Sequence, residues 1–426
     1  MASLRALLPW FQTARGRSFI LRVLLLAAII GFFVYIRRTG DFAGYLLVGN
    51  LVLDGRNIYL DSPPGINTWP PFFSLLCVPL ALLARPTPFL ARGVWVLLNY
   101  GFLLLTLHLV SRLVYGQNLS LRGRTGGLSL AHAELLLPLL LTYYYVTSNF
   151  EHLQINILIF CLTLLGLVLQ SAGRDFKAGM AIGFAAAVKI MPVLFIPYLV
   201  YRRRFRAAAY STVWAALFSL SPILVYGWRR FLEYALTWRR VLETGWGVGK
   251  MNQSVFAMWD RLLGHGMLPL LTAGQNGLVK TDAGLVTAVW YGTLAVVVLA
   301  ALFTFRGRIR QDSREAVVEW CVVFIVAALF GPVAWKAYLV VLLLPNALLY
   351  KVWGSAGLDR KTRRISGAIL LSSFALGGPS SREIVGKSLS GRLEMSSCIT
   401  LAALIVLAGM FWLRGRLLRT DGTMGI

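Results

Sequence analysis

Apolar runs long enough to cross a lipid bilayer recur along the whole chain of 426 residues. A helix that spans the hydrocarbon core needs about 20 apolar residues, within a range of about 17 to 25. We expect spans, a few of them shorter than this, at 18–36, 93–114, 131–147, 153–170, 207–226, 283–305, 316–334, 337–351, 365–380 and 396–413. Because a chain in lipid must satisfy its own backbone polar groups, this pattern predicts an all-α, polytopic transmembrane helical bundle.

Charged side chains are too scarce to cover a water-soluble protein of this length. Only 14% of the residues are charged and 58% are apolar, whereas about a quarter of the residues in a typical soluble domain are charged. Length alone would suggest two or three soluble domains. The repeated spans instead favour one transmembrane domain over residues 1–426.

The net charge of +25 comes from short basic clusters that separate the apolar runs. A soluble protein with this charge would suggest a nucleic-acid partner. Clusters between spans are instead typical of cytoplasmic loops of membrane proteins. They are Arg122 and Arg124, Arg202 to Arg204 with Arg206, Arg306 with Arg308 and Arg310, Lys361 with Arg363 and Arg364, and Arg414 with Arg416.

The stretch 178–201 is ambiguous, because basic residues flank it on both sides. A single span would place these two flanks on opposite sides of the membrane. Two short helices that meet near Lys189 keep both flanks inside, and Pro192 suits the first turn of the second helix. We therefore predict a hairpin.

The segment 70–84 decides the sidedness of everything that follows it. If it spans, the later basic clusters fall outside. It is short and opens with two prolines, so we predict a helix on the outer surface. The result is about 12 spans with both termini in the cytoplasm, the first span being an uncleaved anchor. The two long outer loops, 37–92 and 227–282, are where function is expected.

Asp41 lies about five residues after the first span, and Tyr45 follows one helical turn later on the same face. The simplest alternative is that Asp41 only caps a short helix.

Gln154 and Asn156 lie in a polar segment that joins two spans, and Lys189 interrupts an apolar run. Polar groups at membrane depth are costly and usually line a cavity. The alternatives are a solvated loop for the amides and, for Lys189, a side chain that extends to the membrane surface.

Further polar residues fall on the outer side in this topology: Asn252, Gln253, Arg261, Trp335, Lys336 and Tyr338. Cations beside an apolar bundle suit a lipid phosphate. No carboxylates or histidines are clustered for a metal site, and the four cysteines stand in apolar stretches without paired spacing. We therefore predict no metal and no cofactor.

Taken in order, several motifs resemble glycosyltransferase family 87, a group of GT-C-type membrane enzymes similar to polyprenol-phosphate-mannose-dependent mannosyltransferases. They are Asp41-x-x-x-Tyr45, Trp69-Pro70-Pro71, Gln154-x-Asn156, Lys189-x-x-Pro192, Asn252-Gln253-Ser254 with Arg261, and Pro332-x-x-Trp335, spread from about 37 to 350. The resemblance implies a GT-C-like fold, a sugar donor on polyprenyl phosphate, and chemistry on the extracytoplasmic face. It also implies a catalytic aspartate in the first outer loop, which Asp41 matches.

Two positions depart from the family pattern. Lys336-Ala337-Tyr338 stand where the family often has a histidine after Pro-x-x-Trp, and Leu153 replaces a glycine before Gln-x-Asn. Both departures bear on donor or acceptor preference.

The expected reaction is displacement at the anomeric carbon with inversion, in a bacterial plasma membrane. Asp41 would take the proton of the acceptor hydroxyl, on a lipid or a glycan. The phosphate leaves without a general acid, so one carboxylate suffices. Lys189, Arg261 and Lys336 would stabilise the phosphate. Tyr45, Gln154, Asn156, Asn252, Gln253, Trp335 and Tyr338 would bind sugar or acceptor.

The main alternative is a transporter or lipid flippase. Transporters often carry broken helices in both halves of an internal repeat, and the sequence indicates only one broken pair, at 178–201. The long outer loops favour an enzyme. A non-catalytic scaffold for envelope assembly stays open at this point.

Overall fold

A computed structural model describes residues 13–63, 65–119, 133–244, 251–265, 283–310 and 313–419. Within these ranges every regular element is helical, which confirms the predicted all-α class. The α-helices are α2 (Ala14–Tyr35), α3 (Phe42–Leu53), α4 (Pro71–Ala84), α5 (Pro88–Val110), α6 (Leu136–Glu151), α7 (Asn156–Ser171), α8 (Asp175–Val188), α9 (Phe195–Tyr201), α10 (Phe205–Leu220), α11 (Ile223–Thr244), α12 (Val255–His265), α13 (Ala283–Thr304), α14 (Arg314–Leu329), α15 (Leu343–Gly354), α16 (Arg360–Gly377), α17 (Arg382–Met395) and α18 (Cys398–Arg419).

Short segments of tighter or wider helix extend several of these elements. They are η1 (Ser111–Tyr115), η2 (Ala133–Leu135), η3 (Met191–Leu194), η4 (Lys336–Leu342) and η5 (Gly378–Ser380). The predicted basic loop with Arg122 and Arg124, and parts of the predicted outer loop 227–282, lie outside the described residues.

Five helical stretches in the described chain are long and apolar enough to cross a membrane, or up to seven if each of two bent pairs is one span. The five are Ser18–Tyr35, Pro88–Tyr115, Ala283–Thr304, Lys336–Gly354 and Cys398–Leu417. The predicted number of 12 is not confirmed. The predicted span 316–334 is α14, which has only 16 residues, and the span at 365–380 belongs to α16, whose first turn is strongly basic.

The two bent pairs also correct the expectation of a single broken helix. The pair α6–α7 bends by 120° and the pair α10–α11 by 87°, each across a short break. The first break falls in the polar segment predicted to join the spans 131–147 and 153–170, whereas the second falls inside the predicted span 207–226. The polar residues Gln154 and Asn156 fall at the first of these bends.

Helix α8 ends at Val188, and Lys189 is its C-cap in extended conformation, before η3 and α9. Helices α8 and α10 run in the same direction, since Gly179 of α8 faces Tyr210 while Gly183, one turn on, faces Trp214. The chain between them, η3 and α9, must therefore return in the opposite direction. The two basic flanks of 178–201 lie at the same end of this unit, as the predicted hairpin requires.

Close packing of α8 on α10 depends on the two glycines. A Cβ atom at Gly183 would lie 2.6 Å from the backbone nitrogen of Ala215, and one at Gly179 2.4 Å from Cβ of Tyr210. Small residues spaced four apart let helices approach closely in membranes.

We expect Gly183→Ala to lower the thermal unfolding midpoint in detergent, because overpacking of this kind costs about 1–3 kcal/mol. Gly101→Ala, on a helix position with nothing within 4 Å, is the matched control and should leave the midpoint unchanged or slightly raised. Equal midpoints for the two variants would contradict the close packing.

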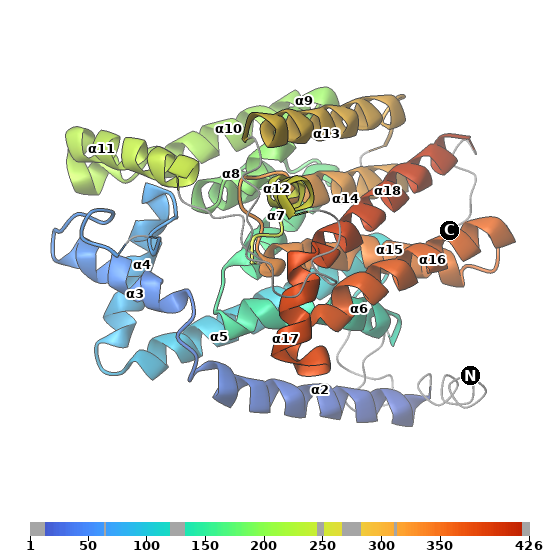
Figure 1. The fold of residues 1–426 in the computed structure, drawn as a ribbon, viewed down its shortest axis with the longest axis horizontal. Helices are drawn as coiled ribbons and strands as arrows, with labels where there is room; N and C mark the ends of the chain where they lie inside the picture. Colours follow the sequence, from blue (N-terminus) through green and yellow to red (C-terminus); the bar gives the residue numbers. More distant parts are fainter. Residues whose placement is uncertain are drawn as a thin grey trace.

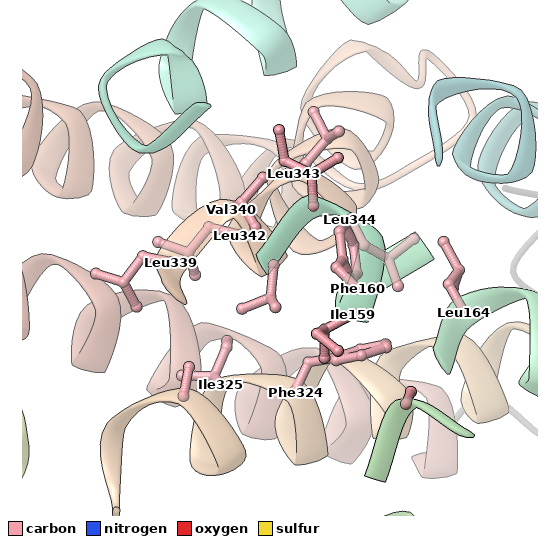
Figure 2. Packing of buried hydrophobic residues seen from close by; sticks show 14 of the residues in the cluster. Ile159, Phe160, Leu164, Phe324, Ile325, Leu339, Val340, Leu342, Leu343 and Leu344 are labelled. Atoms are coloured by element: carbon pink, nitrogen blue, oxygen red, sulfur yellow. The ribbon is translucent and has the colours of Figure 1, made fainter. Parts of the chain in front are cut away.

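The centre of the molecule is an apolar core formed by α7, α14 and the η4–α15 segment. Figure 2 shows Ile159 and Phe160 of α7 near Phe324 of α14, with Leu339, Val340 and Leu342 to Leu344 beside them. Helix α7 begins at Asn156 and η4 begins at Lys336. The core therefore holds the first residues of two helices that carry predicted site residues.

Helices α3 and α4 pack against each other and lie with α11 on the left of Figure 1, while α2 runs along the lower edge. Gly49 of α3 packs on the backbone oxygen of Cys77 in α4. Helix α4 has 14 residues and is too short to be counted as a span. Its position on the outer membrane surface stays a prediction.

Candidate active site

Asp41 is positioned by a backbone contact between two turns. Its N–H donates to the carbonyl oxygen of His152 at 2.9 Å. The preceding residue, Gly40, has a φ of +44°, and a Cβ there would lie 2.4 Å from the same oxygen. The turn that precedes α3 can approach the bend between α6 and α7 only because position 40 lacks a side chain.

The Asp41 carboxylate points away from its own helix. Asp41 occupies the N-cap position of α3, but its side chain makes no capping hydrogen bond to the described residues. Its Oδ2 instead accepts from Nε2 of Gln154 at 2.9 Å. The geometry therefore contradicts the alternative in which Asp41 only caps a helix.

A chain of hydrogen bonds continues from Gln154 to Lys189. Oε1 of Gln154 accepts from Nδ2 of Asn156 at 2.7 Å, and Oδ1 of Asn156 accepts from Nζ of Lys189 at 2.6 Å. The same Nζ lies 3.5 Å from the centroid of the Tyr338 ring. Five residues predicted from the sequence thus form one cluster, which we call the Asp41 cluster: Asp41, Gln154, Asn156, Lys189 and Tyr338.

Burial raises the pKa of Asp41 above its ordinary value. The neighbouring His152 and Lys189 and the hydrogen bond from Gln154 act in the opposite direction and favour the charged carboxylate. A half-buried carboxylate with a raised pKa is suited to accept a proton.

Tyr45 lies next to this cluster within an aromatic wall. It is 1% exposed, and its ring centroid lies 4.8 Å from that of Trp69 and 4.9 Å from that of Phe73. Trp69 belongs to the Trp-Pro-Pro motif, which brings the start of α4 to the site. Tyr45 therefore shapes the wall of the site.

Arg261, Asn252 and Gln253 fall in a second polar cluster. Nη1 of Arg261 donates to the carbonyl oxygen of Asn252 at 2.7 Å, and its Nε and Nη2 donate to Oγ of Ser397. Nδ2 of Asn252 donates to the carbonyl oxygen of Pro332, and Nε2 of Gln253 donates to that of Glu394. These side chains tie the segment before α12 to the turn between α17 and α18.

Lys336 belongs to the second cluster, although Tyr338 belongs to the first. Nζ of Lys336 lies 2.9 Å from Oε1 of Glu394 and 2.9 Å from the hydroxyl of Tyr144. Trp335 precedes it, half-buried, as the N-cap of η4. The start of η4 therefore links the two clusters.

Sequence reasoning missed two contributors, Glu394 and His152. Glu394 is 2% exposed and carries the charge that pairs with Lys336, but α17 contains several other charged residues, so Glu394 did not stand out in the sequence. A lone histidine such as His152 is a weak indication of a metal ligand. Its relevant group is the backbone oxygen that holds Asp41, which no side-chain pattern could reveal. Among the described residues, no group of three His, Cys, Asp or Glu side chains could hold a metal ion.

The backbone at Leu153, which replaces a glycine of the family pattern, has a conformation that favours glycine. Its φ is +49°, in the left-handed region that favours glycine. Its carbonyl oxygen accepts from Nε1 of Trp95 at 2.9 Å, and its side chain is buried. The turn at position 153 therefore adopts a glycine-like conformation with a leucine, whose packing offsets part of the backbone strain.

Comparison with known proteins gives relatives over most of the chain. A polyprenol-phosphate-mannose-dependent alpha-(1-2)-phosphatidylinositol mannoside mannosyltransferase from Mycolicibacterium smegmatis is 25% identical over 338 residues, covering 74% of this chain and 72% of the relative. The protein of the same description from Mycobacterium tuberculosis is 27% identical over 322 residues, covering 71% and 67%.

Two solved structures are similar in overall arrangement. They are ArnT from Cupriavidus metallidurans in the apo state and bound to undecaprenyl phosphate, with TM-scores of 0.42 and 0.40 and identities of 10% and 14%. The matches cover 93% and 95% of this chain, and 78% and 79% of ArnT.

Residues 67–332, more than half of the chain, match the sequence model of glycosyltransferase family 87. The matched range holds Gln154, Asn156, Lys189 and Arg261, and it begins after Asp41. The chain is an integral membrane protein that belongs to glycosyltransferase family 87, and it is a glycosyltransferase.

Proposed function

We propose that this enzyme transfers a hexose, mannose, from a polyprenyl phosphate carrier to a hydroxyl group of a lipid or glycan acceptor. The transfer inverts the anomeric centre and takes place on the extracytoplasmic face of a bacterial plasma membrane, with both termini in the cytoplasm. The relatives named above as polyprenol-phosphate-mannose-dependent support the donor. The observation that carries the proposal is the hydrogen-bonded chain from Asp41 to Lys189.

In the proposed mechanism Asp41 accepts the proton of the acceptor hydroxyl as its oxygen attacks the anomeric carbon. The bond from that carbon to the phosphate oxygen breaks, and the lipid phosphate leaves as an anion. Lys189 stabilises the charge on the phosphate. Because Gln154 and Asn156 connect the two residues, base and cation keep a fixed separation across the reacting sugar, as positioning of this kind requires.

The protein has an apolar groove beside Lys189. The groove has a volume of about 250 Å³ and is lined by the starts of α4 and η3 and by faces of α8, α10 and α11. Ile190, the neighbour of Lys189, is among its lining residues, as are Pro70 and Pro71 of the Trp-Pro-Pro motif. We propose that the prenyl chain lies here with its phosphate at Lys189.

In this proposal Arg261 and Lys336 support the phosphate site indirectly and Lys189 contacts the phosphate. Arg261 already donates to Asn252, and Lys336 already pairs with Glu394. Lys336 adds positive charge close to His152. The second cluster, with Asn252, Gln253 and Trp335, holds the outer segments that enclose the acceptor.

The decisive experiment incubates the purified enzyme with polyprenyl-phosphate sugars, each labelled in the sugar, and a lipid extract from the native cell. We expect label from polyprenyl-phosphate mannose in a glycolipid or glycan product with inverted anomeric configuration. Nucleotide sugars serve as the control donors and should give no product. Movement of labelled carrier across vesicle membranes without any product would favour the transporter alternative.

The raised pKa of Asp41 predicts how activity depends on pH. The base works only when deprotonated, so activity is full above its pKa and is lost as pH falls through it. Because burial raises that pKa, we expect the acid limb of kcat/KM at a higher pH than an exposed aspartate, with its ordinary pKa of roughly 3.9, would give. Full recovery of activity on return to neutral pH is the control for unfolding. An acid limb at or below the ordinary value would contradict the prediction.

A further inference from the structure

A basic cavity lies at the end of the α8–α9–α10 unit opposite Lys189. It has a volume of about 610 Å³. Its lining is Tyr201, Arg202, Arg203, Arg204, Phe305, Gly307, Arg308 and Ile309. Among these described residues four are arginines and none is a carboxylate, so the cavity is suited to an anion.

A buried ion cluster fixes the walls of this cavity. Glu319 is fully buried, and it accepts hydrogen bonds from Nε of Arg202 and from Nε of Arg414, each at 2.7 Å. Nη1 of Arg202 donates to the carbonyl oxygen of Gly307 at 2.9 Å. One carboxylate thus serves two guanidinium groups, which leaves excess positive charge and joins the loop after α9 to the loop after α13.

The cavity borders the end of a helix that is long and apolar enough to cross a membrane. Helix α13 has 22 residues, enough to cross a membrane, and ends at Thr304. The next residue, Phe305, lines the cavity. Arg203 and Arg308 are exposed and stand on the two loops that border the cavity. Basic side chains just beyond a span attract anionic lipids.

An apolar groove runs along the membrane-spanning helices from the same cavity. Its volume is about 340 Å³, and it is lined by residues of α9, α13 and α14. Tyr201 and Phe305 line both the groove and the basic cavity. Figure 1 shows α13 at the edge of the molecule. Val298 and Leu302 of α13, which line the groove, are exposed. On an apolar helix long enough to cross a membrane, exposed side chains of this kind face lipid.

We propose that the cavity and the groove together bind one anionic glycerophospholipid of the surrounding bilayer. Its phosphate lies against Arg203, Arg204 and Arg308, and one acyl chain follows the groove between α13 and α14. The occupant is a bilayer lipid because the groove opens to the membrane along a spanning helix. The site lies at the other end of α9 from Lys189, so it is separate from the proposed donor site. In the topology proposed above it faces the cytoplasmic leaflet.

Lipid binding can be measured by native mass spectrometry of the full-length protein in detergent, titrated with phosphatidylglycerol or with neutral phosphatidylcholine. We expect tight binding of one phosphatidylglycerol. The double variant Arg203→Gln/Arg308→Gln should bind it about 30-fold more weakly, since each basic group at a membrane surface contributes roughly a factor of five to six. The matched control, Lys361→Gln/Arg364→Gln, removes two exposed basic residues elsewhere and should bind as the wild type does.

A second variant tests the groove. Ala301→Phe fills the groove from α13, and we expect weaker phosphatidylglycerol binding with an unchanged unfolding midpoint without lipid. Glycerol phosphate should not compete, because it lacks the acyl chain. Equal binding by the arginine variant and its control would overturn the proposal. Preference for polyprenyl phosphate, or competition by glycerol phosphate, would also overturn it. Binding is read without sugar transfer, so failure of the proposed reaction would leave this test intact.

Discussion

Replacing Asp41 by asparagine is expected to lower the rate of sugar transfer by about a thousandfold, within the range of 10²–10⁴ that a general base contributes. Asparagine has the same shape, and its oxygen can still accept the hydrogen bond from Gln154. It cannot accept the proton of the acceptor. We therefore expect the loss in single-turnover rate, measured with labelled polyprenyl-phosphate mannose, while binding of the donor and the thermal midpoint stay close to wild type.

Asp54→Asn is the matched control for this variant. Asp54 is the exposed C-cap of the same helix, and its loss should leave the transfer rate unchanged. A turnover of Asp41→Asn within about threefold of wild type would remove Asp41 from the mechanism. Loss of both donor binding and the folded state would indicate a structural role instead.

Replacing Gly40 by alanine is expected to reduce transfer by about a hundredfold, although residue 40 performs no chemistry. The added Cβ would lie 2.4 Å from the carbonyl oxygen of His152, so the turn must move. Asp41 follows directly and hydrogen-bonds the same oxygen, so its carboxylate moves as well. A misplacement of about 1 Å costs roughly this factor. The rate of transfer and the unfolding midpoint should be measured on the same preparation.

Gly55→Ala separates the collision from the cost of the backbone conformation. Gly55 also has a positive φ, of +66°, but a Cβ atom at this position would have nothing within 4 Å. Both variants bear the left-handed penalty of about 1–2 kcal/mol for alanine. Only Gly40→Ala should lose activity. Equal activity of the two variants would show that the contact with His152 does not position Asp41.

Helix class and most helix positions could be predicted from the sequence, because apolar length is a direct signal in a membrane. The break at Lys189 could be predicted from the basic residues on either side of it. The break between α6 and α7 falls in the polar segment predicted to join two spans, whereas the break between α10 and α11 lies inside the predicted span 207–226 and was not predicted. The number of spans could not be predicted either, because helices such as α14 are apolar but too short to cross a bilayer.

The Asp41 cluster was largely predictable because it consists of polar residues in apolar surroundings. Gln154, Asn156 and Lys189 stand out by chemistry, and the structure brings them together. The partner of Lys336 was not predictable, since Glu394 lies in a helix with several other charged residues and does not stand out among them. The role of His152 as a backbone acceptor depends on close approach of two turns, which composition does not encode.

The chain of hydrogen bonds from Lys189 to Asp41 has a fixed direction of donation. An ammonium group can only donate and a carboxylate can only accept, so both ends dictate how the two amides between them are turned. Each intermediate position therefore needs a side chain that accepts on one side and donates on the other. Asn156→Asp and Gln154→Glu, although nearly identical in shape, would each remove a donor and bring a second negative charge toward Asp41. Among side chains of this size, only an uncharged amide preserves the order of the chain, which sets a strict limit on the substitutions these two positions can accept.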